Sequence, residues 1–227
     1  MVSISKTRIA NMALSHVGAE HDIESLAEIS TEADAVELWY DYSLQQALEA
    51  FDWSFARKRI VLTLHGDTIS TTSNQPLAGV WGFRYKYPND CIVVRKMQHP
   101  NSPPDNALPF EIELSLAGDE KTILTNVENA VAVYTMFQQS VNLFSPSFVL
   151  ALSFAIAANI AFTLTGKLAL EKSMQEKFFQ AVNHAAAHSL NEAVRKPPRD
   201  ADWIRDRAGV GTGTVGQDWR PFADGSN

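Results

Sequence analysis

The chain has 227 residues, of which 45% are hydrophobic and 20% are charged, and its formal net charge is −7. This is the composition of a globular protein with one sizeable core and room for an extension, and it excludes a wholly disordered chain. The acidic balance argues against a protein that grips nucleic acid, because such proteins carry a basic footprint.

The cysteine content and the first residues bear on where the chain is made. Cys91 is the only cysteine, so the chain can form neither an internal disulfide nor a zinc site built from several cysteines. We expect Cys91 to be a small, buried, apolar residue. Residues 1–18 lack a long apolar run after a basic start, which argues against a signal peptide. We therefore expect synthesis in a reducing cytoplasm.

Two helices are predicted at the start of the chain. The first covers residues 6–17, with Ser5 or Ser3 as its cap and a glycine just past its end. The second covers residues 31–51, with Thr31 as its cap and two acidic residues in its first turn, where the helix dipole favours them.

A strand-rich segment is predicted to follow. The candidate strands are rich in β-branched and aromatic residues and cover residues 59–64, 83–87, 91–97, 110–116, 122–125 and 130–137. Turn sequences separate some of them, among them Pro88-Asn89-Asp90 and Gly118-Asp119-Glu120. Residues 66–79 and 99–109 form two long polar loops, and loops of that length tend to be functional or mobile.

Helix resumes at Ser145-Pro146, where serine caps and proline fits the first turn. Residues 148–165 contain no charged residue, which is near the threshold for a membrane span. The segment is diluted by alanine and carries several polar residues, without a basic cluster or aromatic belts at its ends. We therefore expect a buried core helix and no membrane insertion. The last helix covers residues 168–195 and is stopped by Pro197-Pro198.

The segment from residue 197 to residue 227 has too little apolar surface to fold alone. It is enriched in residue types that anchor protein interfaces. Its candidate interface residues are Trp203, Arg205, Arg207, Trp219, Arg220 and Phe222.

The expected fold class is α+β and mainly helical, with an antiparallel helix core, a strand-rich insertion and an extended C-terminal arm. One domain covers residues 1–196, with helices in 4–55 and 145–196 and the insertion in 56–140, and the arm covers 197–227.

Three patterns that could carry chemistry have simpler interpretations. Residues 211–216 match the dinucleotide-binding motif by letter, but the preceding strand and following helix that it needs have no room there. His184, His188 and Glu192 share a helix face and could hold a metal, although a polar interface strip explains them better. Residues 51–57 are dense in aromatics and indicate a core hub rather than a ligand platform. We expect no catalytic, cofactor-binding or metal-binding residues.

Four segments in order resemble a known family. They are IANMALSHVG (residues 9–18), WSFARKRIVL (53–62), YKYPNDCIVV (85–94) and the stretch from SPSF (145–148) to LTG (164–166). Together they resemble the head-to-tail adaptors, of the tail tubular protein A type, of short-tailed phages. The resemblance implies a structural virion protein at the head–tail junction, made in the host cytoplasm. It further implies a homo-oligomeric ring of about twelve copies, with the portal protein on one face and the tail nozzle protein on the other. DNA would pass through the lumen without specific binding.

The physical properties agree with that resemblance. At −7 per chain, twelve copies would carry −84, and an acidic lumen does not adhere to the phosphates that pass through it. We expect the arm to dock on the portal or an adjacent copy, and the two polar loops to face the tail side or the lumen.

Two alternatives stay open. The chain could be a tail-associated hydrolase acting on envelope saccharides, which would show a cleft with two carboxyl groups, one of raised pKa. It could also be a plain binding module of a bacterial host, which would be a monomer in solution.

Overall fold

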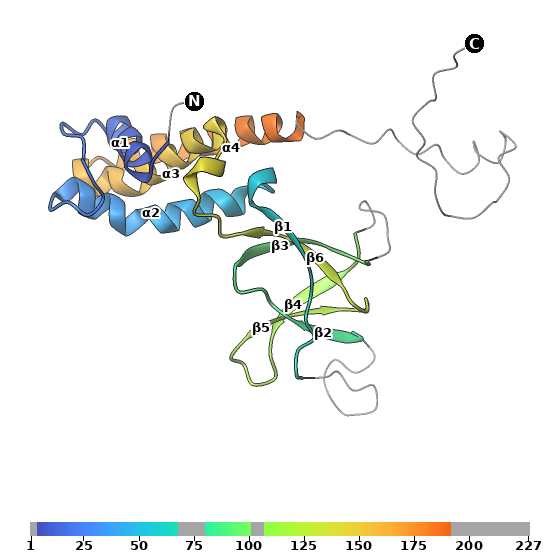
Figure 1. Cartoon of the computed structure of the whole chain (residues 1–227). Helices are drawn as coiled ribbons and strands as arrows, with labels where there is room; N and C mark the ends of the chain where they lie inside the picture. Colours follow the sequence, from blue (N-terminus) through green and yellow to red (C-terminus); the bar gives the residue numbers. More distant parts are fainter. Residues whose placement is uncertain (1–3, 68–79, 101–106, 192–227) are drawn as a thin grey trace, which may run out of the picture. The chain divides into compact units, whose positions relative to one another are not determined.

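A computed structural model describes residues 4–67, 80–100 and 107–191 (Figure 1). All of them belong to one unit of the chain, Met1–Glu192. The helices are α1 (Lys6–Val17), α2 (Thr31–Ala50), α3 (Pro146–Thr165) and α4 (Leu168–Asn191), with 3-10 turns η1 (Ser54–Ala56) and η2 (Val141–Leu143). The strands are β1 (Arg57–Val61), β2 (Phe83–Lys86), β3 (Cys91–Gln98), β4 (Phe110–Leu114), β5 (Lys121–Thr125) and β6 (Val131–Met136).

The fold class is α+β and mainly helical, as predicted, with the strands inserted between α2 and α3. Each of the six predicted strands is present, with ends that differ by a few residues. The predicted arm, residues 197–227, and the last predicted turn of α4 lie outside the described residues.

The first two helices have clear start signals. The Ser5 hydroxyl accepts a hydrogen bond from the Arg8 N–H at 3.1 Å, and Gly18 ends α1 with a φ of 75°, a conformation that glycine adopts without strain. The prediction of Thr31 as the cap of α2 is wrong. Ser30 is the cap, because its backbone is extended and its hydroxyl accepts from the Ala33 N–H at 3.2 Å, whereas Thr31 is already helical.

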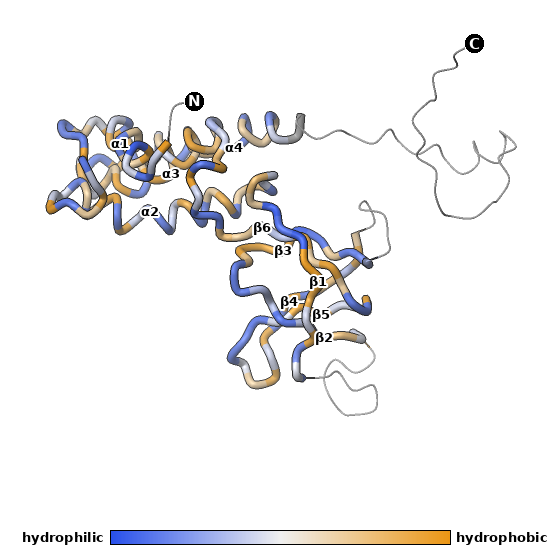
Figure 2. Tube along the Cα trace, viewed as in Figure 1, coloured by the Kyte–Doolittle hydropathy of each residue, from blue (hydrophilic) through white to orange (hydrophobic). Residues whose placement is uncertain are grey.

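Helix α3 lies at the centre of the helical part. Each of the other helices makes most of its helix contacts with α3. The apolar character of α3 is visible along the trace in Figure 2. Its polar residues find partners on neighbouring helices: the Asn159 amide donates to the Ser43 hydroxyl at 2.9 Å, and Ser153 lies 3.1 Å from His16 Nε2.

This packing agrees with the predicted core helix. In the described part of the chain, α3 alone is long and apolar enough to cross a membrane, and 56% of that window is buried within the structure. The core helix of a globular protein passes the same test, so the absence of membrane insertion stays a prediction.

The strands form two antiparallel sheets, ordered β1-β6-β3 and β2-β5-β4. Two isolated bridges link the sheets: Leu64, after β1, pairs with Tyr85 of β2, and Leu108, before β4, pairs with Met97 of β3. Between the sheets lies a second core, separate from the helical one; its fully buried members include Tyr85, Met97, Ile123 and Tyr134. The predicted hairpin turn between β4 and β5 is confirmed, with Gly118 at a φ of 78°.

Candidate functional site

The interface residues predicted from the sequence cannot be placed. They are Trp203, Arg205, Arg207, Trp219, Arg220 and Phe222, and all lie outside the described residues. The same holds for the glycine-rich run 211–216 and for most of the two polar loops, of which residues 68–79 and 101–106 are not described. The orientation expected for those loops therefore stays a prediction. The sites that the structure does describe lie on the helices and the insertion.

The aromatic-dense segment between α2 and β1 is a core hub, as predicted. Trp53 is 1% exposed, and its indole N–H donates to the Ala47 carbonyl at 2.8 Å. Its ring lies edge-on to that of Phe148 at 5.1 Å, and Phe55 contacts the same phenyl ring at 4.9 Å. The hollow beside these rings holds only about 120 Å³, which is too small for a drug-sized ligand.

The two histidines of α4 are exposed and lie side by side. The rings of His184 and His188 lie 4.8 Å apart, edge to face. Glu192, the third member of the candidate metal site, lies outside the described residues. Among the residues that are described, no group of three His, Cys, Asp or Glu side chains is arranged to hold a metal.

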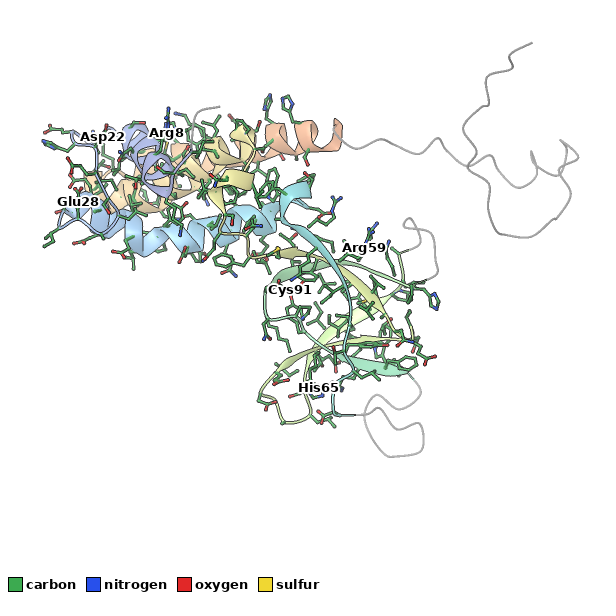
Figure 3. All side chains as sticks on the ribbon, viewed as in Figure 1. Arg8, Asp22, Glu28, Arg59, His65 and Cys91 are labelled. Carbon is green, nitrogen blue, oxygen red and sulfur yellow. The ribbon has the colours of Figure 1, made fainter. Side chains whose placement is uncertain are left out.

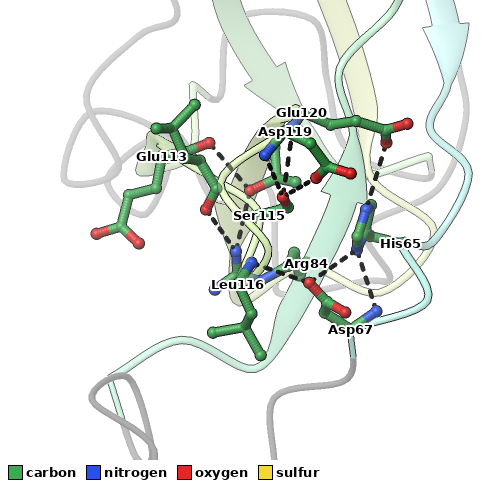
Figure 4. Close-up of polar contacts among 10 residues, drawn as sticks. His65, Asp67, Arg84, Glu113, Ser115, Leu116, Asp119 and Glu120 are labelled. Atoms are coloured by element: carbon green, nitrogen blue, oxygen red, sulfur yellow. Dashed lines mark hydrogen bonds and ion pairs between the residues drawn. The ribbon is translucent and has the colours of Figure 1, made fainter.

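A polar cluster surrounds His65 in the turn after β1 (Figure 4). The Asp67 N–H donates to His65 Nδ1 at 3.0 Å, and His65 Nε2 lies 3.4 Å from the Glu120 carboxylate. The Asp67 carboxylate in turn accepts from the Leu116 N–H at 3.0 Å. The cluster therefore ties the β4–β5 hairpin to the segment after β1.

In the turn of the same hairpin, a serine hydroxyl and a carboxylate form a short hydrogen bond. The Ser115 hydroxyl donates to the Asp119 carboxylate at 2.6 Å, and this bond holds the pKa of Asp119 below its ordinary value. Arg84 of β2 is 4% exposed and donates to the Leu114 carbonyl at 2.9 Å and the Thr122 hydroxyl at 3.2 Å. These bonds brace the three strands of the β2-β5-β4 sheet.

Cys91 is half-buried, so the prediction that it is a buried residue is confirmed only in part. Burial raises the pKa of its thiol, which keeps the sulfur protonated and a poor nucleophile at neutral pH. Cys91 lines an open hollow of about 500 Å³ with Lys86, Tyr87, Glu120 and Lys121 among its neighbours. This hollow contains a single carboxylate.

The arrangement of carboxyl groups bears on the hydrolase alternative. Among the described residues, the carboxyl pKa shifts at Glu28, Asp90 and Asp119 are all downward. At Asp90, burial raises the pKa, but hydrogen bonds from Lys58 at 2.7 Å and Tyr134 at 2.8 Å outweigh it. Neither of the two hollows holds a pair of carboxylates. Neither hollow therefore offers the pair of carboxyl groups that glycoside hydrolysis requires.

Arg95 of β3 links the insertion to the helices, a role that no sequence pattern predicted. Its Nη2 group donates to the carbonyls of Glu49 and Phe51 at 2.8 Å each and to that of Leu48 at 3.3 Å. Helix α2 ends without a glycine cap and without a basic residue in its last turn. Arg95 therefore supplies, from a distant strand, the donors and the positive charge that a helix C-terminus needs.

Large apolar side chains are exposed on several elements, among them Ile29, Phe162 and Phe179, and two groups of them lie close together in the sequence. On α2, Leu38 is 73% and Tyr42 57% exposed; they lie one turn apart, and the Trp39 ring contacts that of Tyr42 at 5.7 Å. We call Leu38, Trp39 and Tyr42 the α2 patch. In the insertion, exposed apolar residues follow β4 into its turn: Ile112, Leu114 and Leu116. These three form the β4 patch.

Helix α2 and the edge strands β1 and β4 also differ in charge. Helix α2 contains five acidic residues and no Lys or Arg. Strand β1 reads RKRIV and strand β4 reads FEIEL, so the two edge strands carry opposite charges. Arg59 of β1 projects from the strand in Figure 3.

Neither a scan of the chain against protein-family models nor a search of curated proteins found a match.

Proposed function

We propose that this chain is a structural subunit of a short-tailed phage: a ring-forming adaptor that joins the portal to the tail nozzle and lines part of the DNA channel. The proposal starts from the four ordered sequence segments that resemble such adaptors. It assigns the chain no enzymatic step and no cofactor.

The observation that carries the proposal is the pair of separate apolar surfaces on one well-packed unit. The α2 patch lies on a helix of the bundle and the β4 patch on the edge of a sheet. Isolated exposed apolar residues are common, whereas groups of them mark contacts with other proteins, and the α2 patch contains the Trp and Tyr that such contacts favour. A subunit held between neighbours in a ring, a portal and a nozzle needs more than one such surface.

The charge of the chain supports the same proposal. A conduit for DNA works best when its wall does not bind phosphates, and the net charge of −7 per chain meets that requirement. The C-terminal arm contributes interface-type residues, and we propose that it docks on the portal or on an adjacent copy.

Co-sedimentation with purified portal rings tests this function. The full-length chain is expected to pellet with the rings, and a variant that ends at residue 196 is expected to bind them far more weakly. Normal assembly of the truncated variant would remove the arm from the proposal. A full-length chain that ignores portal rings would overturn the adaptor function itself.

A further inference from the structure

Strand β1 is a basic edge strand whose outer backbone groups face away from its own sheet. It pairs with β6 alone within its sheet, and its exposed basic side chains are Arg57, Lys58 and Arg59. The Leu62 N–H donates to the Ala130 carbonyl at 2.9 Å, so even-numbered residues of this strand face β6. Because backbone groups alternate along a strand, those of Arg59 and Val61 point outward.

Strand β4 is an acidic edge strand of the other sheet. It pairs with β5 alone within its sheet and carries Glu111 and Glu113. The Ser115 N–H donates to the Glu120 carbonyl at 2.7 Å, in register with the β4–β5 pairing, so odd-numbered residues face β5. The backbone groups of Ile112 therefore point outward, beside the exposed β4 patch.

In the described part of the chain, Arg59 on β1 and both glutamates on β4 have no ion-pair partner. Arg57 pairs with Asp52 at 2.9 Å and Lys58 with Asp90 at 2.7 Å, but Arg59 has no such contact there. On β4, the Trp81 indole N–H donates to the Glu111 carboxylate at 3.0 Å, whereas the Glu113 carboxylate extends away from its neighbours in Figure 4.

We infer that β1 of one copy docks edge to edge against β4 of a second copy of this chain. The two strands run parallel in this contact: the outward backbone groups of Arg59 bond the Ile112 carbonyl and the Leu114 N–H, which places Arg59 opposite Glu113 and brings the contact beside the β4 patch. The inference rests on the ring proposed above and names the contact that closes it.

The signs of the charges select this pairing over the others. Like charges on facing strands repel, so β1 does not pair with β1 and β4 does not pair with β4. Of the pairings between these two edges, only β1 with β4 brings opposite charges together. Because the two edges differ, the contact is heterologous and every copy uses both, so it repeats head to tail, as the contacts of a ring do. Charges that served only to block edge aggregation would not need opposite signs on the two edges.

Charge reversal in two separate variants tests the contact. In Arg59→Glu, two acids face each other at every contact, and in Glu113→Lys two bases do. Each variant alone is expected to self-associate at least roughly tenfold more weakly than the natural chain. In an equimolar mixture, the reversed residue of each variant meets its opposite on the other, so alternating copies restore every contact.

Sedimentation velocity of the full-length chains over a concentration series, at low and high salt, measures the effect. The double variant with both reversals is also expected to recover self-association. Lys167→Glu at the α3–α4 turn and Glu176→Lys on α4 change exposed charges and are matched controls expected to behave as the natural chain. Circular dichroism confirms that each variant is folded.

Several results would overturn the inference. These are a mixture that associates no better than either variant alone, controls that weaken association equally, and a natural chain that stays monomeric at its highest soluble concentration. Portal binding separates this contact from the adaptor function. If portal rings bind every variant equally, the function stands without this contact; if the mixture recovers but no variant binds portal rings, the contact stands without the function.

Discussion

Replacing Arg95 by methionine tests how the strand-rich insertion is held to the helices. The guanidinium group donates to three carbonyls at the end of α2 and, through Nε, to the Thr135 hydroxyl at 2.9 Å. Methionine keeps much of the aliphatic stem and removes every one of these bonds. The last carbonyls of α2 then depend on water, because the helix has no glycine cap of its own.

The expected loss is about 2–3 kcal/mol of unfolding free energy. A hydrogen bond to a charged group contributes about 1.5–3 kcal/mol, and a cation at a helix C-terminus about 0.3–1 kcal/mol. All of these bonds come from one half-buried side chain, so their contributions are not independent and the total is much smaller than their sum. Lysine at this position keeps the charge but not the fork of donors, and about half of the loss is expected to remain.

Urea unfolding of the full-length chain, followed by tryptophan fluorescence and by circular dichroism, measures this loss. Arg8→Met on α1 is the matched control, because it removes an exposed arginine and is expected to change stability by less than about 0.5 kcal/mol. The reasoning is refuted if Arg95→Met costs no more than the control.

Two further predictions concern the helical part. Asn11→Leu removes the two 3.0 Å hydrogen bonds between the Asn11 amide and the backbone N–H and C=O of Ile23, and thermal unfolding should show a loss of about 2 kcal/mol of unfolding free energy. Asn11→Asp should give an intermediate loss, and equal stability of all three chains would contradict the prediction. The pKa of His16 is lowered from 6.5, first by burial and then by the charge of Lys177, so the unfolded chain takes up the proton first. The contribution of neutral His16 to stability is therefore fully present above pH 6.5 and is lost as the pH drops below that value. His16→Gln should flatten this part of the curve of urea midpoint against pH. An unchanged curve would show that other groups cause the pH dependence.

Local signals explain why the secondary structure could be predicted. Ser5, Gly18, Ser145 and Gly166 mark helix ends through bonds and conformations that involve only nearby residues. The one wrong cap arose where Ser30 and Thr31 adjoin, since both residue types cap helices and only the backbone conformation distinguishes them.

The contacts that organise the unit could not be predicted in the same way. Arg95 lies 44 to 47 positions from the carbonyls that it binds, and His16 lies 137 positions from Ser153. No spacing rule connects such residues, because the packing of whole elements brings them together. The proposed contact between β1 and β4 could be predicted only in part. The charges of both strands can be read from the sequence, but their position at sheet edges follows only from the strand order.

The mass of the full-length chain, measured alone and with purified portal rings, tests the adaptor account most directly. The account predicts that portal rings gain about twelve copies per ring and that the complex does not hydrolyse envelope saccharides. A chain that stays monomeric beside portal rings, and that cleaves such saccharides, would contradict it.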